Sequence, residues 1–145
     1  MYLLDTNVVS ELRKVASGKA DANLVAWAET LETSPLYISA ITVLELERGV
    51  LQIERRDERQ GAMLRQWLDG QVLPAFSDRI LPITADIAKA CARLHVPDPR
   101  SERDALIAAT ALVHNLSVVT RNTADFANCG IALVNPWDSQ PALSL

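Results

Sequence analysis

Long apolar runs and cysteine are both scarce in this chain of 145 residues. No stretch approaches the ~20 consecutive apolar residues that a membrane-spanning helix requires, and the first residues lack the basic-then-apolar layout of a signal peptide. Cys91 and Cys129 lie far apart without CxxC spacing, which disfavours a disulfide framework or a thiolate zinc site. We therefore expect a cytoplasmic protein in which Cys91 is a small core residue.

Positive charge is not in excess either. The chain has 14 Lys and Arg against 18 Asp and Glu, a net charge of −4, which argues against a broad basic surface for nonspecific nucleic-acid binding. A nuclease is not excluded, because local basic patches can lie beside an acidic centre. The hydrophobic content of 49% and the length indicate one globular domain. We place it at residues 1–138, with 139–145 as a weakly ordered tail.

Short apolar runs alternate with longer segments of helical periodicity. The alternation predicts an α/β fold of three α/β/α layers, with a mostly parallel central sheet of about five strands and right-handed crossovers. Pro82 would place its strand near a sheet edge or at a strand end. The expected strands are Tyr2–Leu4, Leu36–Ser39, Ile80–Ile83, Ser117–Thr120 and Ile131–Val134, and the main expected helices are Ala22–Leu31, Thr42 to about Leu68, Ala85–Leu94 and Ala105–His114.

Four segments each bring an acidic residue to the carboxyl edge of this predicted sheet, where ligands gather. Asp5 follows the first strand, Glu45 lies in the first turn of the helix after the second, Asp104 opens the helix before the fourth, and Asp125 follows the fourth. Clustered carboxylates repel one another unless they share a cation. Oxygen donors without His or Cys favour Mg²⁺ or Mn²⁺ over zinc, and such a site suits phosphodiester cleavage.

Each acid also has an ordinary structural explanation. Thr42–Glu45 fits the capping box S/T-x-x-E, and Ser101–Asp104 resembles a cap followed by an acid in the first helical turn. Asp5 could be an N-cap, and Asp125 could be a turn residue. Any one of them alone is weak evidence for a metal site.

Hydroxyl, amide and guanidinium groups accompany the acids at the same edge. Thr6, Asn7, Thr120 and Asn122 could orient carboxylates or water around a metal, although turn and cap formers are also expected after strands. Arg121, next to the predicted site, is the best candidate for a contact to a substrate phosphate.

Four motifs, in order, carry a resemblance to a known family: MYLLDTNVVSEL, ISAITVLELERGV, DALIAATALVHNLSVVTRNTADF and ALVNPW. Together they resemble the PIN-domain ribonucleases, specifically the VapC-type toxins of VapBC toxin–antitoxin systems. The resemblance implies that Asp5 and Asp104 are the principal metal-binding acids, with Glu45 as the third. It leaves open whether Asn122 or Asp125 fills the fourth position.

The resemblance also implies a function and partners. The chain is expected to be a Mg²⁺- or Mn²⁺-dependent endoribonuclease, the toxin of a type II pair, which uses metal-activated water and leaves 5′-phosphate and 3′-hydroxyl products. Its partners would be RNA, such as tRNA or another structured RNA, a second copy in a homodimer, and a cognate antitoxin whose C-terminal segment blocks the acidic pocket. Candidate groove residues for the antitoxin, which helical core faces also explain, are Trp27, Leu31, Leu44, Leu51 and Trp67.

Two rival hypotheses remain open. One is a catalytically silent domain that only binds a partner, for example as a corepressor. Against it, a binding module has no need for the electrostatic cost of clustered acids. The other is a phosphatase with Asp5 as nucleophile, which is disfavoured because Asn7 stands where a second acid would be expected.

Overall fold

The central feature of the computed structural model, which describes residues 1–31 and 35–138, is a five-stranded sheet with strand order β3-β2-β1-β4-β5. Every strand pair in it is parallel. This confirms the predicted sheet, while the predicted tail at 139–145 lies outside the described residues. The strands are β1 (Tyr2–Leu4), β2 (Leu36–Ser39), β3 (Ile80–Leu81), β4 (Ser117–Val119) and β5 (Leu133–Val134).

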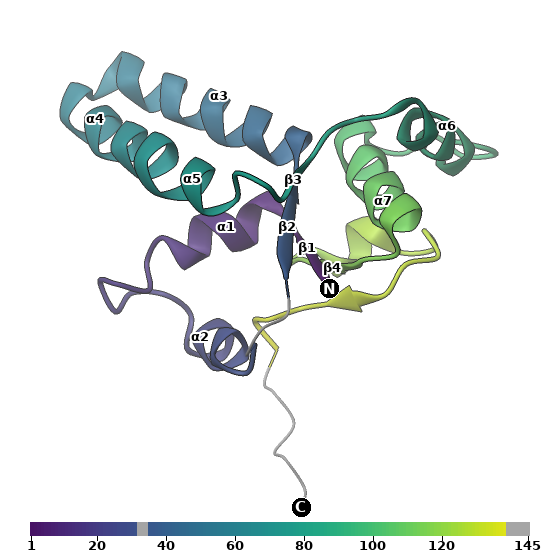
Figure 1. Cartoon of the computed structure of the whole chain (residues 1–145), viewed down its shortest axis with the longest axis horizontal. Coiled ribbons are helices and arrows are strands. Elements are labelled where there is room, and N and C mark those ends of the chain that lie inside the picture. Colours follow the sequence, from purple (N-terminus) through teal and green to yellow (C-terminus); the bar gives the residue numbers. More distant parts are fainter. Residues whose placement is uncertain (32–34, 139–145) are drawn as a thin grey trace, which may run out of the picture.

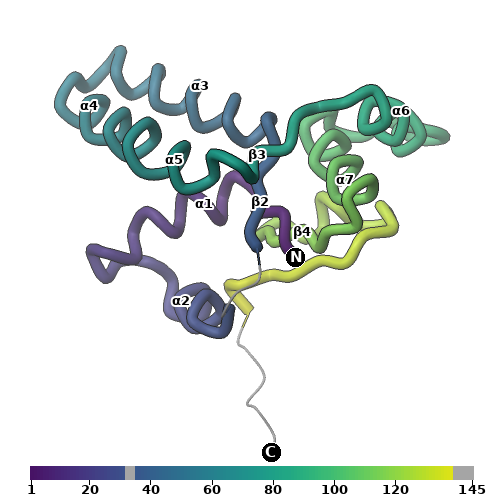
Figure 2. Tube along the Cα trace, viewed as in Figure 1, coloured from purple at the N-terminus to yellow at the C-terminus, as the bar shows by residue number. Residues whose placement is uncertain are grey.

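Helices pack on both faces of the sheet, as Figures 1 and 2 show. The α3–α4 pair lies to one side of the strands, and α6 and α7 lie to the other. The helices are α1 (Thr6–Leu12), α2 (Ala22–Glu29), α3 (Ala40–Arg56), α4 (Glu58–Trp67), a π-helical turn η1 (Leu68–Val72), α5 (Leu73–Ala75), α6 (Ala85–Leu94), α7 (Glu102–His114) and a 3-10 turn η2 (Thr123–Phe126).

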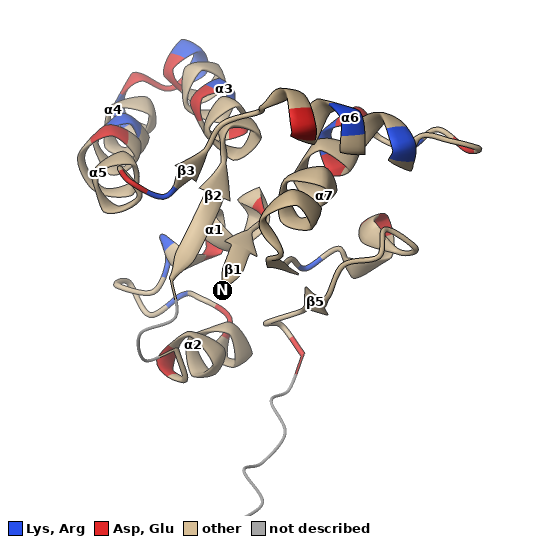
Figure 3. Ribbon diagram, turned by 45° about the vertical axis from the view of Figure 1, so that its right-hand side comes forward, with Lys and Arg blue, Asp and Glu red and all other residues tan. Residues whose placement is uncertain are grey.

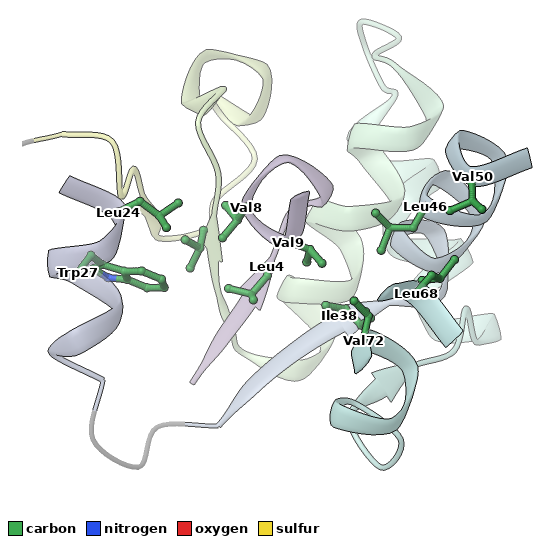
Figure 4. Packing of buried hydrophobic residues seen from close by; sticks show 11 residues of the cluster. Leu4, Val8, Val9, Leu24, Trp27, Ile38, Leu46, Val50, Leu68 and Val72 are labelled. Atoms are coloured by element: carbon green, nitrogen blue, oxygen red, sulfur yellow. The ribbon is translucent and has the colours of Figure 1, made fainter. Parts of the chain in front are cut away.

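The alternation of side chains along β1 separates the two sides of the core. Leu4, with no exposed surface, joins a cluster that includes Val8 of α1 and Leu46 of α3, shown in Figure 4. Leu3, also fully buried, joins Ile107 of α7 in the cluster on the opposite face. Asp5, the residue after Leu4, therefore lies at the carboxyl edge of the sheet, between the helical layers.

The predicted helix from Thr42 to about Leu68 is wrong in its continuity. Asp57 has extended backbone angles, and its carboxylate accepts from the Gln60 backbone N–H at 3.0 Å, so α3 ends and α4 begins there. The two helices then pack closely, because a Cβ on Gly61 would lie 2.5 Å from the Glu54 Cα. Glycine at this position permits the tight hairpin.

The third strand agrees with the expectation from Pro82. β3 is at the edge of the sheet and ends at Leu81, so the missing proline N–H falls beyond the paired residues. Within the described part of the chain, helices are too short or too polar for any of them to span a bilayer.

Candidate functional site

The first acid, Asp5, sits where β1 passes into α1. It is the N-cap of α1, and its Oδ1 accepts from the Thr6 backbone N–H at 2.8 Å. Its Oδ2 accepts from the Thr120 hydroxyl at 2.8 Å and from the Asn7 amide at 3.4 Å. The carboxylate is only 1% exposed, so the cap role and a site role coexist at this buried acid.

Glu45 reaches the same edge from α3. This helix begins at Ala40 and is capped by Ser39, whose hydroxyl accepts from the Ile41 N–H at 3.0 Å. Glu45 therefore lies in the second turn, not the first, and the capping-box alternative for Thr42–Glu45 is wrong. The Glu45 carboxylate instead accepts from the Thr6 hydroxyl, with Oγ1 to Oε1 at 2.6 Å.

Asp104 comes from the first turn of α7. Ser101 caps this helix, its Oγ accepting from the Asp104 N–H at 3.4 Å, as the cap interpretation expected. The cap fixes the start of the helix, so the Asp104 side chain, 15% exposed, is held at the sheet edge. Structural and functional interpretations of this residue are compatible too.

One guanidinium, that of Arg103, joins all three acids. Its Nη2 donates to Asp5 Oδ1, its Nε to Glu45 Oε2 at 2.6 Å, and its Nη1 to Asp104 Oδ1. The Arg103 side chain is 31% exposed. The three carboxylates, which we call the acid pocket, therefore each direct one oxygen to a common cation.

Charge and burial act in opposite directions on Arg103. Burial is the largest single influence and lowers its pKa, but the hydrogen bonds and charges of Glu45 and Asp5 together outweigh it. The net effect is that the pKa of Arg103 is raised above its usual value. Three carboxylates share the single positive charge of one guanidinium, so negative charge is in excess in the pocket. Hard oxygen donors with excess negative charge fit a divalent ion such as Mg²⁺ or Mn²⁺.

The hydroxyl and amide residues predicted at this edge divide into two groups. Thr6, Asn7 and Thr120 contact the acid pocket directly. The Asn122 side chain is exposed, and its backbone N–H donates to the Thr120 hydroxyl at 3.0 Å. Asn122 thus supports the pocket through Thr120.

Arg121 and Asp125 lie further out. The Arg121 guanidinium is 5.3 Å from the centroid of the Trp137 ring, and its backbone N–H donates to Asn7 Oδ1 at 3.3 Å. Asp125 is exposed on η2, and in the described chain its carboxylate has no hydrogen bond or ion pair with the acid pocket. The structure brings Asp5, Glu45 and Asp104 together but not Asp125.

Arg103 is the site residue that sequence reasoning missed. It is adjacent to Asp104 and reads locally as a solvated charge in a polar loop. Its contact with Asp5 spans 98 positions of sequence, and no local pattern shows it. The only signal is that Arg103 lies in the first turn of α7, next to one of the clustered acids.

A second cluster of potential ligands lies between α6 and α7. Cys91, His95 and Glu102 are close together, with His95 Nε2 and Glu102 Oε2 3.5 Å apart. However, His95 Nδ1 accepts from the Arg100 N–H at 3.1 Å, which leaves Nε2 of the neutral ring as a donor to Glu102. Burial also raises the pKa of the Cys91 thiol. We therefore interpret Cys91, His95 and Glu102 as a hydrogen-bonded group between the two helices and not as a set of metal ligands.

A groove runs away from the acid pocket between α1, α3 and α4. It has a volume of about 260 Å³, and Thr6 and Glu45 line its polar end. Its other end is lined by Ile53, Leu64 and Trp67. The Arg13 guanidinium, which also lines it, lies 5.9 Å from the Trp67 ring centroid.

The residues predicted to form an apolar groove are dispersed. Trp67 lines the groove just described, whereas Trp27 is only 5% exposed and belongs to the core. Leu31 is partly buried against that core. Leu44 and Leu51 are about half exposed, at 51% and 53%, on α3.

Charged residues do not gather into one basic face. In Figure 3, Lys and Arg are interspersed with Asp and Glu along α3, α4 and α6. On α4, for example, Arg65 donates to both oxygens of Glu47, each at 2.7 Å, and to Glu54. The acid pocket, not a basic surface, is the distinctive electrostatic feature.

Known proteins are similar to this chain in sequence and in fold. The family model for the PIN domain matches residues 2–130. The chain is 37% identical over 143 residues to VapC ribonuclease Y4jK of Sinorhizobium fredii, covering 95% of this chain and 99% of that protein. It is 36% identical to toxin FitB of Neisseria gonorrhoeae, covering 94% and 99%.

Solved structures agree. The crystal structure of FitAcB from Neisseria gonorrhoeae superposes with a TM-score of 0.84 at 36% identity, covering 94% of this chain and 99% of that one. A structure of FitAB bound to a DNA fragment gives 0.86 at 33% identity, covering 97% and 99%. The chain belongs to the PIN domain family, and its full-length relatives in that family include VapC-type toxins.

Proposed function

We propose that this protein is a metal-dependent endoribonuclease, the toxin of a type II toxin–antitoxin pair, acting in the cytoplasm. The observation that carries the proposal is the convergence of one oxygen each from Asp5, Glu45 and Asp104 on a single cation at the carboxyl edge of the sheet. The relatives named VapC ribonuclease and toxin FitB support it. We also propose that residues 1–138 form a single nuclease domain.

Asp5, Glu45 and Asp104 would hold Mg²⁺ or Mn²⁺, and the metal when bound would supply activation of water and neutralisation of phosphate charge. The Thr120 hydroxyl holds Asp5 Oδ2, and the Thr6 hydroxyl holds Glu45 Oε1. These bonds orient the other oxygen of each acid toward the centre of the pocket. Such outer contacts set both the geometry and the affinity of a metal site.

Substrate RNA would approach from the open side of the pocket. Arg121 is exposed beside it and is our candidate for a phosphate contact. Asp125 and Asn122, exposed in the segment after β4, are candidates for the fourth acidic or water-orienting position. The expected products carry 5′-phosphate and 3′-hydroxyl ends.

A cognate antitoxin is the proposed regulator. The groove between α1, α3 and α4 shares Thr6 and Glu45 with the acid pocket, so a segment lying in it would block access to the acids. Solved relatives are described as FitAcB and as FitAB on DNA, which supports a bound partner. We also propose a homodimer of the toxin chain.

The test is cleavage of structured RNA, tRNA included, by the full chain purified free of any partner. Wild type is expected to cleave with Mg²⁺ or Mn²⁺ and to stop with EDTA. Asp104→Asn should lower the cleavage rate by more than about 100-fold, because substitution of even an outer partner of a metal ligand lowers affinity or activity about 10–100-fold. Glu102→Gln is the matched control, because Glu102 lies in the same turn with a side chain 76% exposed.

Two results would reject the enzymatic proposal. Cleavage that persists in EDTA or in Asp104→Asn would place the chemistry elsewhere. No cleavage by wild type, together with no metal binding, would favour the silent partner-binding domain. Trapping of a phosphoaspartate at Asp5 would revive the phosphatase hypothesis.

A further inference from the structure

We propose that Arg103 is an exchangeable internal cation of the acid pocket, which a divalent metal must displace in order to bind. This inference rests on the proposed metal site, but it concerns a residue outside the four motif acids. The guanidinium and the metal would use the same carboxylate oxygens. Arg103 would therefore set the metal affinity of the chain.

The division of oxygens within the pocket carries the argument. Asp5 Oδ2 is engaged by the Thr120 hydroxyl at 2.8 Å, and Glu45 Oε1 by the Thr6 hydroxyl at 2.6 Å. The oxygens bonded to Arg103 are Glu45 Oε2, Asp104 Oδ1 and Asp5 Oδ1, the last of which also accepts from the Thr6 backbone N–H at 2.8 Å. A metal that binds all three acids through these oxygens needs the volume that the guanidinium occupies.

Arg103 is held in the pocket almost entirely by the charges that a metal would neutralise. Its guanidinium hydrogen bonds in the described chain go to the three acids and, at 3.4 Å, to the Thr6 hydroxyl. Its side chain is 31% exposed, whereas Asp5 beneath it is 1% exposed. The acid is therefore fixed at the sheet edge, whereas the Arg103 side chain is partly exposed to solvent.

The same contacts give Arg103 a role before metal arrives. Three carboxylates this close repel one another, and a shared guanidinium relieves that repulsion. The metal-free chain therefore keeps the acids together. By linkage, whatever free energy Arg103 contributes to the metal-free pocket is subtracted from metal binding.

Calorimetric titration of Mn²⁺ into the metal-free full chain tests the exchange. Arg103→Gln is expected to bind Mn²⁺ roughly tenfold more tightly than wild type, within the range usual for coupling between two ligands. Its metal-free Tm should be lower, and Mn²⁺ should raise that Tm by more than it raises the Tm of wild type. Arg103→Lys, which keeps a charge but not the planar fork, should have an intermediate affinity.

Arg65→Gln is the matched control. The Arg65 guanidinium is also shared among carboxylates, but those of Glu47 and Glu54 both come from α3, where their spacing from Glu45 places them on the opposite side of the helix. Its loss should lower Tm and leave Mn²⁺ affinity unchanged. A tighter Mn²⁺ affinity in this variant as well would mean that net charge alone causes the effect, and it would overturn the proposal.

The outcomes separate this inference from the proposed function. Equal or weaker Mn²⁺ binding by Arg103→Gln and Arg103→Lys, beside measurable binding by wild type, would overturn the exchange and leave the metal site standing. No Mn²⁺ binding by any of them would overturn both. If Arg103→Gln does not fold, the comparison of Arg103→Lys with wild type decides.

Discussion

The hydroxyl of Thr120 donates to Oδ2 of Asp5 at 2.8 Å, and both side chains are buried. The two residues are neighbours because β1 and β4 pair in parallel, with Leu4 opposite Val119, so each strand delivers its next residue to the same edge. This bond fixes how the Asp5 carboxylate is turned and so which of its oxygens faces the acid pocket.

Thr120→Val is predicted to weaken Mn²⁺ binding by about 10–100-fold, the usual effect of removing an outer partner of a metal ligand. It should also lower the free energy of unfolding by about 1–3 kcal/mol, because a buried carboxylate oxygen loses the nearer of its two donors. Calorimetric titration and chemical denaturation measure the two effects.

Thr110→Val is the control for this prediction. Thr110 is equally buried, but its hydroxyl donates to the Leu106 carbonyl inside α7 at 2.8 Å. This variant should change stability alone. Equal Mn²⁺ affinity in Thr120→Val and wild type would contradict the orienting role.

Gly61→Ala is predicted to destabilise the protein by about 1–3 kcal/mol, the usual cost of overpacking. The added Cβ would meet the Glu54 backbone at 2.5 Å and push α4 away from α3. Gly49→Ala is the matched change within α3, where a Cβ meets nothing within 4 Å. It should stabilise by about 0.5–1 kcal/mol, and opposite signs in chemical denaturation are the expected result. A neutral Gly61→Ala would show that the hairpin is looser than described.

The lowered pKa of Glu11 predicts that part of the free energy of unfolding depends on pH. Its pKa is lowered from 4.5, first by the backbone N–H of Asp21, which donates to it at 2.8 Å, and then by Lys14. A lowered pKa means that the stabilisation is fully present above pH 4.5 and is lost as the pH falls through the lower, folded-state pKa.

The measurement is the unfolding free energy of wild type and Glu11→Gln from pH 7 down to acid. The difference between them should be largest near neutral pH and should shrink below the ordinary pKa of Glu11. A difference independent of pH would mean that the hydrogen bonds of Glu11 do not depend on its charge.

The sheet was predictable because its strands are short apolar runs bounded by polar residues. The break between α3 and α4 was not predicted, because apolar spacing continues on both sides of it. A local signal was present: Asp57 followed by Gln60 three positions later is a capping pattern. Strand order depends on which helices cover which face, and periodicity along the chain does not contain that information.

The acid pocket was predictable in its three acids because strand ends in parallel sheets meet at one edge. Arg103 was not, since its partners lie in three separate elements. The prediction that Glu45 lies in the first turn of its helix was wrong. Ser39 caps α3, so the helix starts earlier than the Thr42 pattern suggested.

The predicted role of Asp125 can be tested against that of Asp104. Asp125 is exposed, and among the described residues its carboxylate has no hydrogen bond or ion pair with the acid pocket. Asp125→Asn should therefore reduce RNA cleavage by at most about 100-fold, as expected for an outer group, and should keep Mn²⁺ affinity within a few-fold of wild type. A loss as large as that of Asp104→Asn would make Asp125 a direct ligand.

The most direct measurement of the central claim is anomalous diffraction from crystals of the full chain soaked in Mn²⁺. We predict an anomalous peak among Asp5, Glu45 and Asp104, with the Arg103 side chain turned out toward solvent. A well-ordered acid pocket without a peak, or a peak only at Cys91, His95 and Glu102, would contradict it.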